Sequence, residues 1–397
     1  MHNRKVCFLC PWMDVEGGLQ RVVSNVANQF AEKYEVCLCI ISIRTGKPFY
    51  PLNPKIKVVN FPLAANGSSN LFVRGIRKIF NNIEIPLPDK IMRALYYPKG
   101  KVSILEDFLA DEKFDDVIAA CGELSMLLGC IDRKRVKANL FGWQHSSYNA
   151  YFKRRGYYYY GREKLAKSLY ANLDAMILLT KKDCEIYRKK FNVHCLYIYN
   201  PLSFVSERKA DFNSKFLIFV GRMERGPKGI DYLAEILQSV FKDSRADGWE
   251  IYVVGDGKDR QDFENSIQSA GISQRVRMTG RSSNVTECYL KSSVFVNTSR
   301  WEGFGLVVTE ALECGLPVVA FETDGPMEII SDGREGFLIE KFDIPAFAEC
   351  ILKLMSDDKL REEMSKKAVI RAKDFSAPAV LEKWTALFEE FDTTLND

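Results

Sequence analysis

Two glutamates flank a glycine-rich turn in the stretch SRWEGFGLVVTEALECGLPVVAF, residues 299–321. Glu302 stands directly before Gly303-Phe304-Gly305, and Glu310 follows eight residues later within an apolar run at 307–314 that predicts a buried helix. A helix that only fills a core needs neither carboxylates nor flexible backbone at its start. The stretch is therefore either a ligand site or an ordinary strand–helix turn.

Two cations follow another apolar run in FVGRMERGPKGIDYL. The run ends at Gly221, and Arg222 and Lys228 come before the next helical pattern. Two positive charges at the end of a parallel strand suit the two phosphates of a nucleoside diphosphate. The alternative is a pair of solvated surface charges.

A two-glycine turn, Gly17-Gly18, follows the first apolar run and opens the helical pattern LQRVVSNVANQF. Such a turn lets backbone N–H groups at a helix start approach an anion. The pattern is not G-x-G-x-x-G and lacks the acid that binds a nicotinamide ribose, so a dehydrogenase is disfavoured. A plain strand–helix turn is the alternative.

The elements that must position these residues alternate along the chain. The runs expected as buried strands are KVCFLC, EVCLCIISI, IKVVNF, DDVIAA, ANLFGW and DAMILLT in the first half, then KFLIFVG, WEIYVVG, VRMTG, VFVNTS, PVVAF and GFLIE in the second. Helical patterns lie between them, near 18–33, 157–171, 229–241, 260–270, 284–292 and 307–314. Apolar strands separated by helices are typical of parallel sheets covered on both faces. We predict an α/β protein with two doubly wound, Rossmann-like domains, which bind ligands at the carboxyl ends of their strands.

Three segments divide the chain. Asn200-Pro201 interrupts the alternation, so we expect a first domain over residues 1–200 and a second over 201–376. Residues 377–397 hold a lone amphipathic helix with Trp384, Leu387 and Phe388 on one face. No strand follows this helix, so we expect it to pack back on the first domain.

Composition excludes several classes of protein. The 397 residues are 47% hydrophobic and 27% charged, as in a soluble globular protein. No apolar run reaches the ~18–20 residues of a membrane-spanning helix, and the N-terminus enters a strand rather than a secretion signal. The C-x-x-C of Cys7 and Cys10 has no second pair, so core packing of reduced thiols is expected, in the cytosol.

Charge is divided unevenly. Residues 1–200 hold 31 Lys and Arg against 18 Asp and Glu, a net +13, whereas residues 201–397 hold 25 against 34, a net −9. The first half is therefore expected to face something anionic. Residues 72–98 fit either a basic amphipathic helix pair on an anionic membrane or a solvated helical excursion. The basic and aromatic run at 151–167 has no nucleic-acid motif beside it, so no nucleic-acid partner is predicted.

Taken together, EGGLQRVV, FVGRMERGPKGIDYL, VVGDGKDR, TGRSSNV and the stretch at 299–321 resemble the retaining glycosyltransferases of the GT-B fold, in the large family-four group (glycosyl transferases group 1). The resemblance covers nearly the whole chain and is most specific over residues 216–340. Glu302 and Glu310 match that group's E-x7-E element. The resemblance implies two domains facing across a cleft, with the acceptor on the first and the nucleotide sugar on the second.

For the donor's sugar and ribose, the resemblance implies roles for the residues around the two glutamates. Glu310 would accept hydrogen bonds from the ribose, and Glu302 would lie at the transferred sugar. Backbone N–H groups of Gly303-Phe304-Gly305 would meet sugar hydroxyls, and those of Leu306 and Val307 would touch the phosphates.

The remaining matches concern the diphosphate, the base and the first domain. Arg222 and Lys228 would neutralise the leaving diphosphate, with Gly17-Gly18 closing on it from the first domain. Arg281 would lie at the base, and His145, after ANLFGW, would face the sugar. The expected catalytic set is Glu302, His145, Arg222 and Lys228.

The implied reaction moves a hexose or N-acetylhexosamine, with retention, from a nucleotide-diphosphate sugar to a saccharide acceptor. A UDP-sugar and a polyprenyl-diphosphate-linked acceptor are favoured, in synthesis of capsule, O-antigen or exopolysaccharide on the cytoplasmic face of the inner membrane. No cofactor or metal is expected, and no D-x-D pair occurs. Asp14, Glu16 and Glu123, on loops after strands, are candidates for orienting an acceptor hydroxyl.

Three alternatives remain open. One is a GDP-mannose-dependent mannosyltransferase. Another is a nucleotide-sugar epimerase of the same fold. The third is a non-catalytic protein that binds a nucleotide sugar or an anionic lipid.

Overall fold

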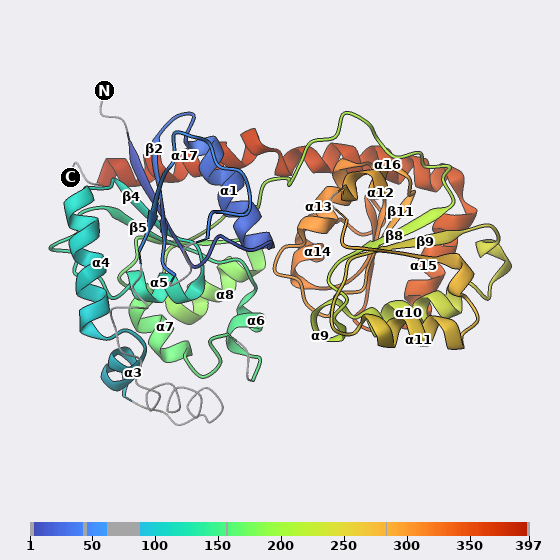
Figure 1. Ribbon diagram of the computed structural model, residues 1–397, viewed down its shortest axis with the longest axis horizontal. Coiled ribbons are helices and arrows are strands. Elements are labelled where there is room, and N and C mark those ends of the chain that lie inside the picture. The colour runs from blue at the N-terminus through green and yellow to red at the C-terminus, as the bar shows by residue number, and fades with distance from the viewer. Residues whose placement is uncertain (1–3, 43–45, 62–87, 156–157, 283, 395–397) are drawn as a thin grey trace. The chain divides into compact units, whose positions relative to one another are not determined.

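The computed structural model describes residues 4–42, 46–61, 88–155, 158–282 and 284–394. The chain forms two compact units (Figure 1). Unit 1 comprises Met1–Pro201 together with Val380–Asp397, and unit 2 comprises Leu202–Ala379. Each unit has its own parallel sheet with helices packed on it.

The sheet of unit 1 has seven strands in the order β3-β2-β1-β4-β5-β6-β7, and every neighbouring pair is parallel. Its central strands are rich in Val, Ile, Leu and Cys and fully buried, because helices cover both faces. The strands are β1 (Lys5–Cys10), β2 (Glu35–Ile40), β3 (Lys57–Asn60), β4 (Asp116–Ala119), β5 (Asn139–Trp143), β6 (Ala175–Leu178) and β7 (Cys195–Tyr197). The helices are α1 (Gly18–Phe30), α3 (Asp89–Tyr96), α4 (Lys99–Glu112), α5 (Gly122–Leu128), α6 (Tyr148–Phe152), α7 (Glu163–Tyr170) and α8 (Lys181–Phe191).

The C-terminal helix α17 (Ala377–Thr394) completes the core of unit 1 (Figure 1). Trp384 is fully buried, with its ring 5.2 Å from that of Trp143 on β5 and 5.7 Å from that of Phe30 on α1. Phe388 packs on the same Phe30, at 5.5 Å. The expected return of this helix to the first domain is therefore confirmed.

The sheet of unit 2 has six strands in the order β10-β9-β8-β11-β12-β13, again all parallel. The strands are β8 (Phe216–Val220), β9 (Glu250–Val254), β10 (Val276–Gly280), β11 (Val294–Asn297), β12 (Val318–Phe321) and β13 (Gly336–Ile339). The helices are α9 (Arg225–Lys228), α10 (Ile230–Val240), α11 (Arg260–Ser269), α12 (Val285–Leu290), α13 (Leu306–Glu313), α14 (Asp324–Ile329), α15 (Ile344–Ser356) and α16 (Asp358–Ala372).

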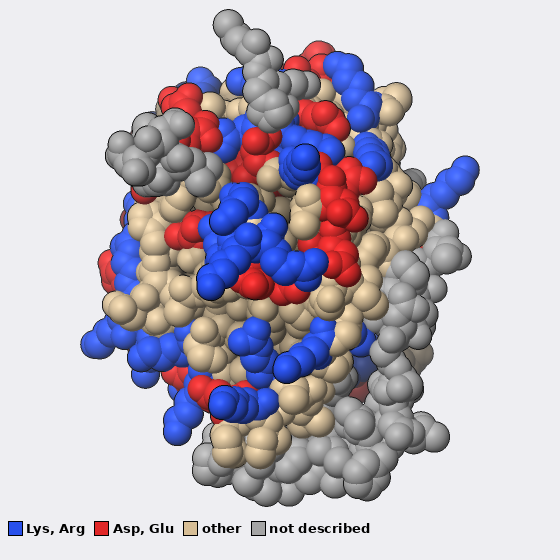
Figure 2. Space-filling model, turned by 90° about the vertical axis from the view of Figure 1, so that its left-hand side faces the viewer, with Lys and Arg blue, Asp and Glu red and all other residues tan. Residues whose placement is uncertain are grey.

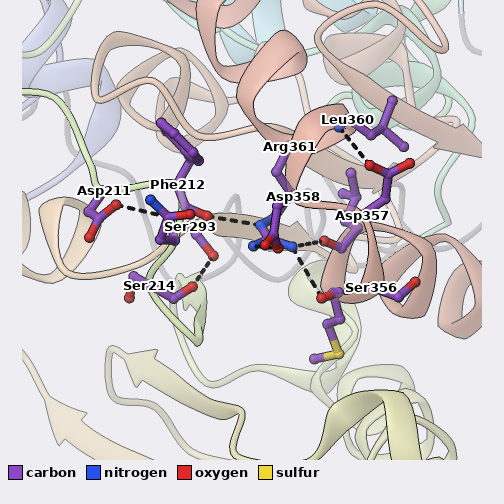
Figure 3. Close-up of polar contacts among 12 residues, drawn as sticks. Asp211, Phe212, Ser214, Ser293, Ser356, Asp357, Asp358, Leu360 and Arg361 are labelled. Atoms are coloured by element: carbon purple, nitrogen blue, oxygen red, sulfur yellow. Dashed lines mark hydrogen bonds and ion pairs between the residues drawn. The ribbon is translucent and has the colours of Figure 1, made fainter.

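A buried arginine secures the turn between α15 and α16 (Figure 3). The Nε of Arg361 donates to the Phe212 carbonyl at 2.9 Å, and Nη1 donates to the Met355 carbonyl at 3.1 Å. Its guanidinium also lies 5.1 Å from the Trp249 ring. These contacts tie the amino-terminal side of β8 to the helix pair, which is the side away from the strand ends where ligands bind.

The predicted architecture is confirmed: two doubly wound parallel sheets and a helix that returns to the first. Each predicted strand is present, whereas β7 was not anticipated because its three residues, Cys195–Tyr197, carry too short a pattern.

Cys7 and Cys10 are buried in β1, and burial raises the pKa of the Cys10 thiol well above its ordinary value. Most of the region at 72–98 lies outside the described residues.

On one side of unit 1, basic and acidic side chains lie intermixed (Figure 2). Part of this pairing involves α4, where Glu112 lies 2.8 Å from Lys57 and 3.1 Å from Lys5. Two of the basic residues of this unit are thus paired with one acidic residue. No helix of the described part of the chain is long and apolar enough to cross a membrane.

Candidate functional site

Glu302 lies just beyond the carboxyl end of β11, in the segment that leads to α13. Its Oε2 accepts a hydrogen bond from the Lys228 ammonium at 2.5 Å and one from the Ser299 hydroxyl at 3.2 Å. Both charged side chains are largely buried, at 16% exposure for Lys228 and 18% for Glu302. The carboxylate is therefore held in one place by two donors before any ligand arrives.

Lys228 reaches Glu302 because the loop after β8 turns sharply back on β11. Gly229 has a φ of +60°, a left-handed conformation that ends α9. The Thr298 hydroxyl donates to the Lys228 carbonyl at 3.0 Å. A Cβ on Gly229 would lie 2.2 Å from the Thr298 carbonyl oxygen, so only glycine fits there.

The glycine-rich turn after Glu302 is clamped from two sides. The Phe304 ring is buried and packs 5.7 Å from that of Phe375. The N–H of Gly325 donates to the Glu302 carbonyl at 3.1 Å, and a Cβ on Gly325 would lie 2.0 Å from the Phe304 carbonyl oxygen. Gly305, with a φ of +99°, then starts α13.

Helix α13 presents amides and carries the second glutamate. The N–H groups of Leu306 and Val307 belong to its first turn, where no carbonyl of the same helix can accept them. Glu310 is 3% exposed, and its Oε2 accepts a hydrogen bond from the Tyr289 hydroxyl at 3.0 Å. The two glutamates thus have separate partners, one with Lys228 and one with Tyr289.

Two further predicted residues stand at strand ends of the same sheet. Arg222 follows β8, is 69% exposed and pairs with Glu224 at 2.8 Å rather than with the Lys228–Glu302 pair. Its loop is braced by the turn after β9, since the Met223 N–H donates to the Asp256 carbonyl at 3.0 Å. Arg281 is exposed and follows Gly280, the last residue of β10.

In unit 1, His145 follows β5 and packs with its ring centroid 4.4 Å from that of Trp143. Its backbone N–H donates to the Tyr151 hydroxyl at 3.2 Å. Neither ring nitrogen has a hydrogen-bond partner among the described residues. Burial lowers the pKa of His145 to about 3, because the charged imidazolium is desolvated there. The imidazole is therefore neutral at physiological pH.

Gly17 and Gly18 lie at the start of α1, also in unit 1. Gly17 has an extended backbone, with a φ of −177°, that any residue adopts. A Cβ there would meet only the Gln20 side-chain amide, at 2.3 Å, and a flexible side-chain end can move away. The fold itself therefore does not require glycine at this position.

The structure brings Lys228, Glu302 and the start of α13 together at the carboxyl ends of β8 and β11, which are adjacent strands. Arg222 follows β8 itself, and Arg281 follows β10, which is separated from β8 by β9 in the same sheet. His145 and Gly17-Gly18 belong to the other unit. The sequence reasoning missed Tyr289, Thr298 and Gly325, which act as supports for predicted residues. Thr298, directly after a strand, carried a positional signal, whereas nothing in the sequence marked the other two.

Chemically, this edge of unit 2 offers a nearly buried ammonium, helix-start amides that have no acceptor within their own helix, and two carboxylates. Ammonium and amide groups bind an anion such as a diphosphate. Carboxylates accept hydrogen bonds from hydroxyl groups. In the described residues, no three His, Cys, Asp or Glu side chains gather in a way that could hold a metal ion.

Known proteins resemble this chain over most of its length. Residues 205–371 match the family model described as "Glycosyl transferases group 1". A Haemophilus influenzae protein named as an uncharacterized glycosyltransferase is 25% identical over 393 residues, 97% of this chain and 99% of that one. A Campylobacter jejuni protein, a GalNAc-alpha-(1->4)-GalNAc-alpha-(1->3)-diNAcBac-PP-undecaprenol alpha-1,4-N-acetyl-D-galactosaminyltransferase, is 25% identical over 97% of this chain and 98% of its own.

The solved structure of Staphylococcus aureus TarM, a mutant in complex with fondaparinux, alpha-GlcNAc-glycerol and UDP, superposes with a TM-score of 0.73. The two chains are 18% identical, and the match covers 97% of this chain and 99% of that one. At this identity the likeness concerns the fold.

Proposed function

We propose that this chain, whose residues 205–371 form a glycosyl transferases group 1 domain, is a retaining glycosyltransferase. It takes a hexose or N-acetylhexosamine from a nucleoside-diphosphate sugar, a UDP-sugar foremost, and passes it to a saccharide acceptor. The observation that carries the proposal is the Lys228–Glu302 pair beside the start of α13. It sets an anion-binding group next to a hydroxyl-binding group, as the diphosphate and the sugar joined to it in a nucleotide sugar require.

The proposed chemistry follows from where charge develops. As the bond between the sugar and the diphosphate breaks, negative charge grows on the leaving phosphate. Lys228, Arg222 and the amides of Leu306 and Val307 stabilise that charge. Glu302 accepts a hydrogen bond from the transferred sugar and Glu310 from the ribose, which fixes the donor's position.

We propose that the configuration at the anomeric carbon is retained because the acceptor attacks that carbon from the face that the diphosphate leaves. The acceptor hydroxyl forms the new glycosidic bond, and its proton passes to the departing phosphate oxygen. The chain's own groups supply the charge stabilisation, so we propose that no divalent metal takes part. Neutral His145 is proposed to exchange hydrogen bonds with the sugar hydroxyls.

The proposed acceptor is a polyprenyl-diphosphate-linked saccharide of a surface polysaccharide. The C. jejuni relative, whose printed name gives a PP-undecaprenol acceptor, supports this choice. The net +13 of residues 1–200 would favour contact with an anionic lipid surface. We propose that the protein acts in the cytoplasm, in peripheral contact with the inner membrane.

The test measures release of nucleoside diphosphate from UDP-glucose, UDP-galactose, their N-acetyl forms and GDP-mannose, with and without EDTA. We expect the wild type to use a UDP-sugar in both conditions, and Lys228→Ala and Glu302→Ala to lower the rate about 100-fold or more. Lys366→Ala is the matched control, because it removes a cation from an exposed pair with Glu362 on α16. Full activity of Glu302→Ala would contradict the proposed site. A preference for GDP-mannose would contradict the proposed UDP-sugar donor. Loss of activity in EDTA would contradict the proposal that no metal takes part.

A further inference from the structure

A nearly buried arginine holds a half-exposed glutamate at the carboxyl end of β4 in unit 1. The Nη1 of Arg162 donates to Oε2 of Glu123 at 2.8 Å, and its Nη2 donates to the Tyr158 carbonyl at 2.8 Å. The Arg162 side chain is 7% exposed, whereas that of Glu123 is 44% exposed. Arg162 is therefore fixed and nearly buried, whereas the Glu123 carboxylate is accessible.

Aromatic rings fix the guanidinium further. Its centre lies 4.6 Å from the ring centroid of Tyr96 and 4.8 Å from that of Tyr159, within the range of cation–π contacts. The Tyr159 hydroxyl accepts a hydrogen bond from the Glu123 N–H at 2.9 Å. The Nε of Arg162 is buried and has no partner among the described residues.

This arrangement differs from an ordinary structural ion pair. A pair that only stabilises a fold is expected to satisfy the donors of its buried partner, because each unmet donor destabilises the folded state. Here the buried Nε of the arginine has no acceptor among the described residues, while the carboxylate partner of the arginine stays half exposed. A carboxylate has room for about four hydrogen bonds, and Arg162 supplies one at Oε2, so Glu123 can accept others.

The pair lies on the same sheet edge as His145. Glu123 follows β4 and His145 follows β5, and these strands are parallel neighbours. The Tyr151 hydroxyl accepts the His145 N–H, and its ring lies 4.9 Å from that of Tyr159. One packed aromatic layer thus supports both the histidine and the glutamate.

We propose that Glu123 accepts a hydrogen bond from a hydroxyl of the acceptor sugar, and that Arg162 is the positioning residue that holds its carboxylate. The inference rests on the proposed function and deepens it, because it assigns a contact to the acceptor rather than to the donor. Glu123 then determines which acceptor hydroxyl is presented. Arg162 acts only through Glu123 and touches no substrate.

The test compares transfer to an acceptor with hydrolysis of the donor. The acceptor probes are octyl diphosphates α-linked to glucose, galactose, N-acetylglucosamine or N-acetylgalactosamine, with the donor that the wild type hydrolyses fastest. For Glu123→Gln we expect the ratio of transfer to hydrolysis to fall about tenfold, because the glutamine keeps only a neutral acceptor in place of the charged one. For Arg162→Met we expect a raised acceptor KM with kcat largely kept at saturating acceptor, and for Arg162→Lys a partial return.

The matched control is Glu163→Gln on α7, a glutamate of the same unit paired with Lys153 at 2.9 Å and with the Tyr148 hydroxyl at 2.8 Å. It should keep the wild-type ratio. Circular dichroism and melting temperature identify a variant that fails to fold, and in that case Glu123→Asp, which keeps the charge and shortens the side chain, takes the place of Glu123→Gln.

The outcomes separate the two proposals. An unchanged ratio in a folded Glu123 variant overturns the inference, as does a wild type that hydrolyses its donor but glycosylates no probe. A wild type that releases no nucleoside diphosphate from any donor overturns the proposed function instead. A fall in kcat alone for Arg162→Met would show that Arg162 does more than position Glu123.

Discussion

Lys228 and Glu302 neutralise each other at 2.5 Å, so an anionic ligand has to share the ammonium with a carboxylate. An ammonium has three donors, and one can stay on Glu302 while the others turn to phosphate. Binding of the phosphate and binding of the sugar are then coupled, because a phosphate bound to Lys228 also fixes the position of the Glu302 carboxylate. The separate setting of Glu310, held by Tyr289, leaves the second carboxylate unaffected by that exchange.

The buried imidazole of His145 predicts a loss of stability in acid. Its native pKa of about 3 lies below the ordinary value of 6.5. Between these two values the unfolded chain binds a proton that the native state does not. The contribution of the neutral His145 imidazole to stability is therefore complete above pH 6.5. It falls as the pH drops towards 3, by at most about 1.4 kcal/mol per pH unit. In His145→Gln, the free energy of unfolding should vary less steeply with pH over this window.

Chemical denaturation at pH 4, 5, 6 and 7 measures these slopes. His194→Gln serves as the control, because that histidine lies in the same unit with a half-exposed side chain. This variant controls for the loss of an imidazole that is not buried. Identical slopes for His145→Gln and the wild type would show that the imidazole is solvated and charged in the native state.

At the scale of elements, the site is built where loops after adjacent parallel strands meet. The loop after β8 brings Lys228, and the loop after β11 brings Glu302, because β8 and β11 are neighbours although about 75 residues separate them in the sequence. The closeness of the loops is maintained by glycines at which a side chain would strike backbone. Gly229 combines this requirement with a left-handed backbone.

Substituting Gly229 tests how the turn places the lysine. An L-residue in the left-handed region costs about 1–2 kcal/mol, and Gly229→Ala adds a contact of 2.2 Å with the Thr298 carbonyl. We expect a lower melting temperature for unit 2 together with slower release of nucleoside diphosphate, because Lys228 is displaced. Calorimetry and the release assay measure the two effects.

Gly333→Ala isolates the conformational part of that cost. Gly333 also has a left-handed backbone, with a φ of +73°, but no atom lies within 4 Å of its Cβ position. The Gly333→Ala variant should lower the melting temperature less than Gly229→Ala does, and it should release nucleoside diphosphate at the wild-type rate. Equal shifts in both variants would mean that the Thr298 carbonyl moves aside without consequence.

Strands could be predicted from the sequence more accurately than contacts between side chains. Runs such as KVCFLC and PVVAF became strands within one residue of the expected bounds, because strands buried on both faces need continuous apolar residues. The pairing of Arg162 with Glu123 left no such pattern, since it joins residues 39 apart through tyrosines that looked like part of a basic surface run. Helix ends were predicted to within a few residues, except near 157–171, where α7 begins only at Glu163.

At the scale of the whole molecule, unit 1 is discontinuous in sequence. Its core is lined by residues of the first half and completed by α17, more than 170 residues after the last strand of its sheet. Unit 2 is a continuous stretch of chain, Leu202–Ala379. The two units therefore depend differently on the C-terminal helix.

Truncating Trp384 should destabilise unit 1 selectively. Its side chain is fully buried against Trp143 and Phe30, so Trp384→Ala should cost about 3–5 kcal/mol. Amide hydrogen exchange should accelerate in β1, β4 and β5, while β8 and β11 keep their protection. Trp249→Ala, at the fully buried tryptophan of unit 2, should give the opposite pattern. Uniform acceleration in both sheets would show that the units unfold as one.

The discontinuity of unit 1 also bears on how the chain folds as it is synthesised. A nascent chain that has just released β7 has all seven strands of its first sheet, yet the apolar faces of Phe30 and Trp143 still lack their cover. Unit 2 emerges next and can close its own core at once, because it needs nothing from later residues. The unit that the ribosome begins first is thus completed last, and during that interval its uncovered aromatic surface is where a chaperone would bind.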